Sequence, residues 1–298
     1  MRFNPKARLD TRRTRQASGG GGGGGLGRGI SVPGGVGGTS IGGIIVTLVI
    51  AVAVYYLSGQ GGGSEQTYDS DRYAACETGE DANSSADCAR VAVENSLDDY
   101  WGDTLGSRYR PITALTTFTG SVDTGCGGAT SDVGPFYCPV DQTIYLDTGF
   151  FDDVLERELG GPDGGFVEAY VLAHEFGHHV QDLLGTMGRV KTQQGPQSDS
   201  VRLELQADCY AGMWTRAATS TDDASGVVIF SELTDQDIRL ALEAAASVGD
   251  DRIQQKTQGQ VTQESWTHGS AEQRMHWFRT GCDSGSLERC DTFGVPTV

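Results

Sequence analysis

His174-Glu175-Phe176-Gly177-His178 lies inside a longer run, residues 166–181, whose composition predicts a helix. Because residues four apart stand one above the other on a helix, His174 and His178 project from the same face. Two imidazoles at this spacing can hold one zinc ion. Glu175 lies about 100° further round the helix, where its carboxylate can reach a water molecule at the metal. These five residues predict half of a metal centre.

The surrounding sequence favours a helix. Apolar residues recur at roughly helical spacing through the run, and Gly185 and Gly188 follow it as a stop. An ordinary core helix that carries two histidines is the alternative interpretation. The chain has 5 histidines, however, and His179 is the third of them in this one run. That concentration favours a metal-binding helix.

A second stretch, residues 203–214, offers the missing ligand. A catalytic zinc site needs a third protein ligand and an open position for water. Glu204 and Asp208 are four residues apart, hence on one face of a second predicted helix. Glu204 can complete a His, His, Glu ligand set, and Asp208 can accept the spare N–H of His174 and fix its tautomer. A solvated acidic pair is the alternative interpretation.

The order of these motifs resembles the gluzincin metallopeptidases, in which H-E-x-x-H is followed by E-x-x-A-D. The longer sequences at residues 174–181 and 204–212 resemble the bacterial neutral zinc metallopeptidase family, as do residues 134–147 and 267–274. The resemblance covers roughly residues 40–283. It implies an α+β, zincin-like fold with a mostly helical body and a small mixed β-sheet. It also implies one Zn²⁺ per chain and hydrolysis of peptide bonds in a peptide or protein substrate, with Glu175 as general base.

Two further roles follow only from the resemblance. In zincin folds an edge strand pairs with the extended substrate, which makes Ile144, Tyr145 and Leu146 the candidate pairing strand; an interior strand is the alternative. Gluzincins also use a further His or Tyr to stabilise the oxyanion, and His268 is the candidate, with a capping or structural role as the alternative. The resemblance assigns no role to Arg274, for which a salt-bridge partner is favoured over a catalytic residue.

Charge divides the chain unevenly. The formal net charge is −18. Residues 1–57 carry seven basic side chains against Asp10 alone, which leaves an acidic body and argues against nucleic-acid binding by the folded part. Residues 1–40 are basic and then glycine-rich, so we expect a disordered tail.

An apolar run at residues 41–57 is just long enough to span a bilayer as one helix. A cleaved signal peptide or a buried core segment are the alternatives. The upstream arginines predict a cytoplasmic N-terminus, so the sequence predicts a single-pass protein of the cell membrane. A linker at residues 58–67 would then lead to an extracytoplasmic catalytic domain, residues 68–298.

The 7 cysteines suit an exported domain. Three locally spaced pairs predict the disulfides Cys76–Cys88, Cys126–Cys138 and Cys282–Cys290. Cys209 is left over, and a small buried thiol is favoured over zinc ligation.

Other elements follow from hydrophobic periodicity and capping residues. We expect helices at residues 86–105, 150–159, 200–215, 235–248 and 270–279, strands at 112–118 and 142–147, and a surface loop at 250–263. Two other functions remain open: a zinc amide hydrolase acting on cell-wall peptide, and a non-catalytic binding or scaffold module.

Overall fold

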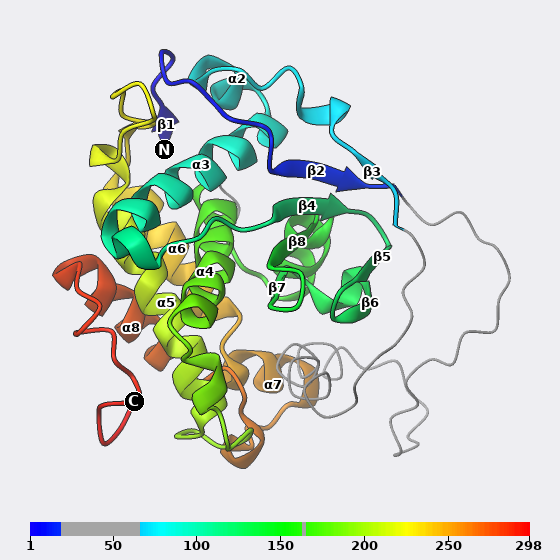
Figure 1. Ribbon diagram of the computed structural model, residues 1–298. Helices are drawn as coiled ribbons and strands as arrows, with labels where there is room; N and C mark the ends of the chain where they lie inside the picture. The colour runs from blue at the N-terminus through cyan, green and yellow to red at the C-terminus, as the bar shows by residue number, and fades with distance from the viewer. Residues whose placement is uncertain (19–65, 163–164) are drawn as a thin grey trace, which may run out of the picture.

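The computed structural model describes residues 1–18, 66–162 and 165–298. A helical body packs beside a five-stranded mixed sheet, and the helix α4 (Gly165–Leu183) lies between the two in Figure 1. The α+β class with a small mixed sheet is therefore confirmed. The sequence prediction of a helix at 41–57 lies outside the described residues.

The sheet has the order β3-β2-β4-β8-β7. Its strands are β3 (Tyr68–Asp69), β2 (Thr14–Ala17), β4 (Ala114–Phe118), β8 (Thr143–Asp147) and β7 (Phe136–Cys138). β2, β4 and β8 run parallel to one another, whereas β3 and β7 are antiparallel to their neighbours. A separate hairpin joins β5 (Ser121–Thr124) to β6 (Gly127–Thr130).

The predicted substrate-pairing strand is an interior strand. Ile144, Tyr145 and Leu146 lie in β8, which is hydrogen-bonded to β4 on one side and to β7 on the other. Their side chains are at most 1% exposed. The prediction that these residues form an edge strand is therefore wrong, because the backbone groups of β8 that a substrate would need are hydrogen-bonded to its two neighbours. The edge strand that contacts α4 is β7.

Residues 1–18 are part of the fold, in contrast to the predicted disorder of residues 1–40. β1 (Arg2–Phe3) pairs with β9 (Phe230–Glu232), and β2 is inserted between β3 and β4. One of the basic side chains that suggested a tail has two acidic partners in the fold: Arg13 bonds to the fully buried Glu94 at 2.9 Å and to Asp98 at 2.7 Å. Residues 19–40 lie outside the described part.

The predicted location in a membrane needs correction. Within residues 1–18, 66–162 and 165–298, no helix combines the length and apolar character needed to cross a bilayer. In addition, residues before and after the run 41–57 lie in one sheet, because β2 pairs with both β3 and β4. A cytoplasmic N-terminus and an extracytoplasmic body are therefore incompatible with this fold. The predicted linker 58–67 falls almost entirely outside the described residues.

Most helix predictions agree with the structure within a few residues. The helices are α2 (Gly79–Ser84), α3 (Ala86–Leu105), α4, α5 (Asp199–Ala217), α6 (Asp235–Ser247), α7 (Asp250–Gln258) and α8 (Ala271–Ser284), with the π-helical segment η5 (Phe151–Glu158) after β8. The surface loop predicted at 250–263 is wrong, since α7 occupies its first half. Ser270 is the N-cap of α8, as predicted, in a capping box with Gln273.

Helix α5 packs closely against α8 through glycines. A Cβ atom on Gly281 would stand 1.8 Å from the carbonyl oxygen of Cys209, and one on Gly212 would stand 2.0 Å from that of Phe278. Only glycine fits at these two positions. The same kind of contact joins α4 to α5, where a Cβ atom added to Gly177 would stand 3.1 Å from the backbone of Ala207.

The cysteine pairing agrees with prediction in two cases. Cys76–Cys88 and Cys126–Cys138 are present, but Cys290 bonds to Cys209 rather than to Cys282. The predicted Cys282–Cys290 pair is wrong because Cys282 lies within α8, whereas the chain after α8 brings Cys290 to α5. Cys282 is the unpaired cysteine of the described residues.

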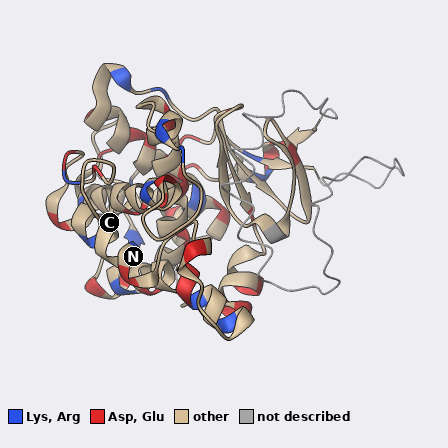
Figure 2. Ribbon diagram, turned by 90° about the horizontal axis from the view of Figure 1, so that it is seen from below, with Lys and Arg blue, Asp and Glu red and all other residues tan. Residues whose placement is uncertain are grey.

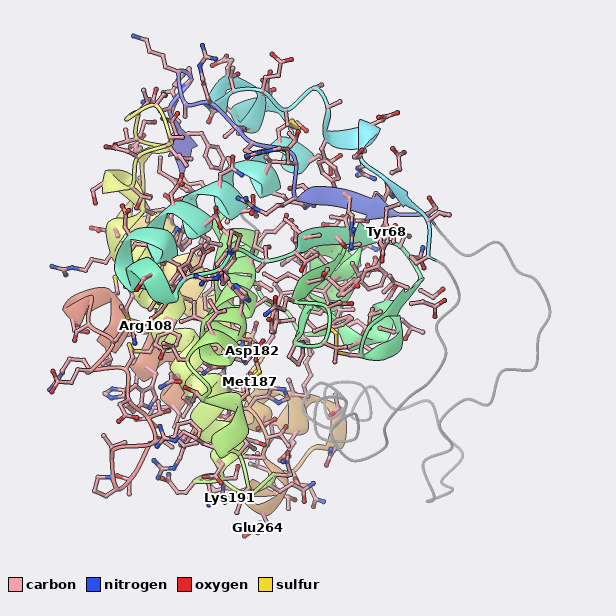
Figure 3. The ribbon with its side chains drawn as sticks, in the orientation of Figure 1. Tyr68, Arg108, Asp182, Met187, Lys191 and Glu264 are labelled. Atoms are coloured by element: carbon pink, nitrogen blue, oxygen red, sulfur yellow. A yellow bond between two sulfur atoms is a disulfide. The ribbon has the colours of Figure 1, made fainter. Side chains whose placement is uncertain are left out.

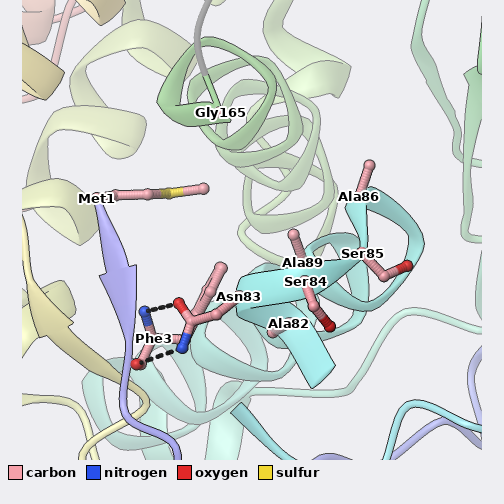
Figure 4. A pocket seen from close by; sticks show the side chains of 9 residues that line it. All are labelled: Met1, Phe3, Ala82, Asn83, Ser84, Ser85, Ala86, Ala89 and Gly165. Carbon is pink, nitrogen blue, oxygen red and sulfur yellow. Dashed lines mark hydrogen bonds between the residues drawn. The ribbon is translucent and has the colours of Figure 1, made fainter. Parts of the chain in front are cut away.

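Acidic residues are spread over the helices in the view of Figure 2 rather than gathered in one place. The absence of nucleic-acid binding stays a prediction. A pocket lies at the start of α4, between β1 and the α2–α3 junction, where the side-chain amide of Asn83 makes two hydrogen bonds to the backbone of Phe3 (Figure 4). It lies away from the histidine motif, which is further along α4.

Candidate metal centre

Two adjacent helices bring the predicted ligands together. α4 carries His174 and His178, and α5 carries Glu204. One potential ligand atom of each residue lies within 4.8 Å of the other two. The close approach at Gly177 lets α5 come near enough for a carboxylate to reach both imidazoles. All three side chains are largely buried.

The Glu204 carboxylate stands between the two imidazoles. Its Oε2 is 3.2 Å from His174 Nε2, and its Oε1 is 3.6 Å from His178 Nε2. The opposite ring nitrogens are engaged elsewhere: His174 Nδ1 bonds to Asp208 at 2.8 Å, and His178 Nδ1 bonds to Gln181 at 2.9 Å. Both Nε2 atoms therefore face the carboxylate, which is the arrangement that a shared metal ion requires.

Asp208 is the centre of a buried polar cluster. It is fully buried and accepts hydrogen bonds from His174, from the Tyr170 hydroxyl at 2.6 Å and from Arg274. Arg274 binds it with two nitrogens, Nε at 2.8 Å and Nη2 at 2.9 Å. The guanidinium is itself buried, so the two charges compensate each other away from water.

The pKa values of the two histidines shift in opposite directions. Burial alone would lower the pKa of His174, but the carboxylates of Asp208 and Glu204 outweigh it and raise the pKa to about 10. Burial lowers the pKa of His178 to about 4, despite the nearby Glu204. Burial opposes ionisation of Glu204, yet the two imidazoles hold the pKa of its carboxyl well below the ordinary value.

Glu175 lies beside the ligands without being one of the three. Burial raises the pKa of its carboxyl to about 8, and Glu204 adds to the effect. The carboxylate accepts a hydrogen bond from the backbone N–H of Tyr137 in β7. A carboxylate poised near neutral pH next to a metal ligand set has the properties of a general base.

His268 lies before α8 and is held by Asp250. Its Nδ1 bonds to the Thr267 hydroxyl at 2.9 Å and to Asp250 at 3.4 Å, while Asp250 also accepts the backbone N–H of His268 at 2.7 Å. Its Nε2 is buried and has no hydrogen-bond partner among the described residues. The charge of His268 acts on Glu204, so the ring lies near the ligand set.

Several polar residues of this region had no assigned role from sequence. Gln181 lies in α4 and Gln206 lies in α5. Tyr170 donates a hydrogen bond to Asp208, and Asp250 accepts one from His268. Three of these residues lie within the two motif helices, close to a predicted ligand. Gln181 is three residues from His178, Gln206 is two from Glu204, and Tyr170 is four from His174. This spacing was the sequence signal that could have identified them. Asp250 had no such signal, because it is 18 residues from His268 in sequence.

The family comparison agrees with this geometry. A family described as "Putative neutral zinc metallopeptidase" matches residues 1–293. The chain belongs to this family. The match includes residues 1–18, so the N-terminal strands are within the family region. This confirms the resemblance inferred from the motifs.

Two relatives with names that state no activity match most of the chain. An uncharacterized protein of Mycobacterium tuberculosis (strain H37Rv), Rv2575, is 52% identical over 222 residues, 74% of this chain and 75% of the relative. The uncharacterized protein YpfJ of Escherichia coli (strain K12) is 38% identical over 284 residues, 90% of each chain. No solved structure matches the chain.

The donor set of this family member fits zinc. Two imidazole nitrogens and one carboxylate are a common catalytic zinc ligand set, with a position left for water. Because the pKa of His174 is raised in the metal-free site, binding of the ion would release a proton from this ring. The fixed tautomers of His174 and His178 place the correct nitrogens inward. His174, His178 and Glu204 are therefore the residues that would hold the ion.

Proposed function

We propose that this protein is a zinc-dependent metallopeptidase that hydrolyses peptide bonds. The observation that carries the proposal is the grouping of His174, His178 and Glu204 within 4.8 Å, with the buried Glu175 beside them. Pure zinc storage would not need a carboxylate at position 175.

The ion, when bound, supplies Lewis-acid polarisation of a carbonyl and lowers the pKa of water to about 7. Glu175 takes the proton from the attacking water and passes it to the leaving amine. Its position beside the ligand set suits both transfers. Asp208 holds His174 in the tautomer that directs Nε2 to the ion, and Arg274 and Tyr170 keep Asp208 ionised and in place.

The substrate backbone pairs with β7, in place of the strand predicted from sequence. β7 is an edge strand, and it contacts α4, the helix that carries Glu175. Main-chain pairing along this edge would bring a scissile carbonyl to the general base.

His268 stabilises the oxyanion in this proposal. Its buried Nε2 lacks a partner among the described residues, and its Nδ1 is held from behind by Thr267 and Asp250. A donor fixed in this way costs no reorganisation when charge develops on the substrate oxygen. This role is separate from metal binding.

The test compares the full chain with the Glu175→Gln variant, each carrying the same amount of zinc. Both are incubated with a library of unfolded peptides and, separately, with cell-wall peptide. Cleavage of peptides by the wild type and its loss in the variant, with zinc retained, is the expected result. Cleavage confined to cell-wall amides would indicate the amide hydrolase instead. One bound zinc with no cleavage by the wild type would favour a binding module.

A further inference from the structure

Gln181 and Gln206 lie in the two metal-binding helices but take no part in the chemistry proposed above. Gln181 in α4 is fully buried, and Gln206 in α5 is 4% exposed. Each side-chain amide uses both its oxygen and its nitrogen. A buried, fully bonded amide has a fixed orientation, so these two residues can hold others in place.

The hydrogen bonds form a relay that starts at a metal ligand. His178 Nδ1 is 2.9 Å from Gln181 Oε1. Gln181 Nε2 donates to the carbonyl of Leu203 at 2.7 Å and to Gln206 Oε1 at 3.1 Å. Gln206 Nε2 in turn donates to the carbonyl of Cys290 at 3.0 Å.

Two backbone carbonyls decide the direction of this relay. A carbonyl oxygen can only accept, so the amide nitrogens of Gln181 and Gln206 must face Leu203 and Cys290. Gln181 Oε1 therefore faces His178 and can only accept its Nδ1 proton. The proton is thus held on Nδ1, and Nε2 keeps the lone pair that a metal needs.

The far end of the relay is fixed by a disulfide. Cys290 is fully buried and is bonded to Cys209, three residues after Gln206 on α5. Cys290 lies in the segment that follows α8, which ends at Ser284. The disulfide links this C-terminal segment to α5. The bond holds the Cys290 carbonyl over Gln206.

We propose that Gln181 and Gln206 are positioning residues for the metal ligand His178, and that the Cys209–Cys290 disulfide sets the far end of their relay. The inference rests on the proposed function only in taking His178 as a zinc ligand. Zinc affinity then depends on a disulfide that touches none of the three ligands.

The readout is metal binding rather than peptide cleavage. The apparent zinc dissociation constant of the full chain is measured by competition with a chromogenic chelator, and the absorption spectrum of bound Co²⁺ reports the ligand geometry. We expect Gln181→Met to weaken zinc binding roughly 10- to 100-fold, as loss of a partner of a ligating histidine does elsewhere. Gln254→Met is the matched control, because this buried glutamine makes comparable hydrogen bonds on α7.

The disulfide arm uses a double variant, Cys209→Ala with Cys290→Ala. We expect zinc binding to weaken roughly 2- to 30-fold, the range of coupling through such a network. Its control is Cys76→Ala with Cys88→Ala, which removes a disulfide between the start of α3 and the preceding segment. That control is expected to leave the zinc dissociation constant unchanged.

A double-mutant cycle separates the relay from a general loss of structure. In a Gln206→Met background the relay is already interrupted, so removing the Cys209–Cys290 bond should change zinc affinity by less than about twofold. Independent losses that multiply would overturn the role of the disulfide. Unchanged zinc binding in Gln181→Met would overturn the relay as a whole.

The outcomes stay separate from those of the proposed function. If the wild type binds zinc and cuts nothing, the peptidase proposal fails while the affinity comparison remains decisive. If the Cys209/Cys290 variant does not fold, Gln181→Met and Gln206→Met carry the test, with far-ultraviolet circular dichroism to verify their folding. Loss of Co²⁺ signal in both with normal dichroism supports the relay, and wild-type signal in both refutes it.

Discussion

Replacing Arg274 by Met should destabilise the protein more than any other change at the rim of the metal centre. Arg274 makes two short bonds to Asp208, and both side chains are buried. Without the guanidinium, Asp208 keeps the Tyr170 hydroxyl and His174 as partners but loses the only full positive charge that is independent of pH. Removing one partner of a buried ion pair costs about 3–5 kcal/mol. For a protein of this size the Tm should fall by roughly 6–20 °C.

Thermal unfolding is followed in a chelating buffer and again with excess zinc. The matched control is Arg279→Met, an exposed arginine on the same helix, which we expect to change Tm by less than about 2 °C. Adding Asp208→Asn to Arg274→Met removes the unpaired charge, so the double variant should be more stable than the sum of the two single losses predicts. A loss below about 1 kcal/mol in Arg274→Met, or strictly additive losses, would refute the reasoning.

Three other outcomes follow from the fold. Gly281→Ala should prevent α5 and α8 from packing, because the added Cβ would stand 1.8 Å from a backbone oxygen; a loss of several kcal/mol in urea unfolding is expected, and near-wild-type stability contradicts it. Deleting residues 1–18 should abolish the cooperative thermal transition, since β3 and β4 lose the strand between them. Burial and the adjacent Asp98 raise the pKa of Asp99 from 3.8 to about 6, so the folded state binds more protons than the unfolded state between these values. Stability should therefore fall from pH 4 to 6, by about 1 kcal/mol after discounting for partial exposure. Asp99→Asn should remove this slope in urea titrations, while Asp235→Asn, a change of an exposed carboxyl at the start of α6, keeps it.

Short-range features of the sequence predicted the structure well. The limits of α3 agree with the prediction to the residue, and Ser270 caps α8. His174 and His178 share a face because four residues make one helical turn. Glu204 and Asp208 share one face of α5 for the same reason. Each of these features depends on the geometry of one or two helical turns, which the local sequence determines. That the two faces meet was predicted only through the family resemblance, because the contact joins residues 34 apart.

Long-range contacts could not be predicted from the same information. Composition made residues 1–18 look like a disordered tail, because the acidic partners of Arg13 lie more than 80 residues away. Local spacing paired Cys282 with Cys290, whereas the true partner, Cys209, is 81 residues distant. The strand at 143–147 could be identified from its residues, but its neighbours in the sheet could not. The same limit applies to Asp182, which is labelled in Figure 3: it accepts a hydrogen bond at 2.9 Å from the hydroxyl of Tyr137, 45 residues earlier in the chain.

The pairing of the first strand has a consequence for how the chain is made. Arg2 is hydrogen-bonded to Ser231, 229 residues later, so β1 has no partner until most of the protein has been synthesised. At ordinary rates of translation this delay is on the order of 10 to 50 s. β2 likewise waits for β4 before it can be enclosed. β1 is therefore among the last strands of the described residues to find its partner, whereas β2 can pair as soon as β4 has been made.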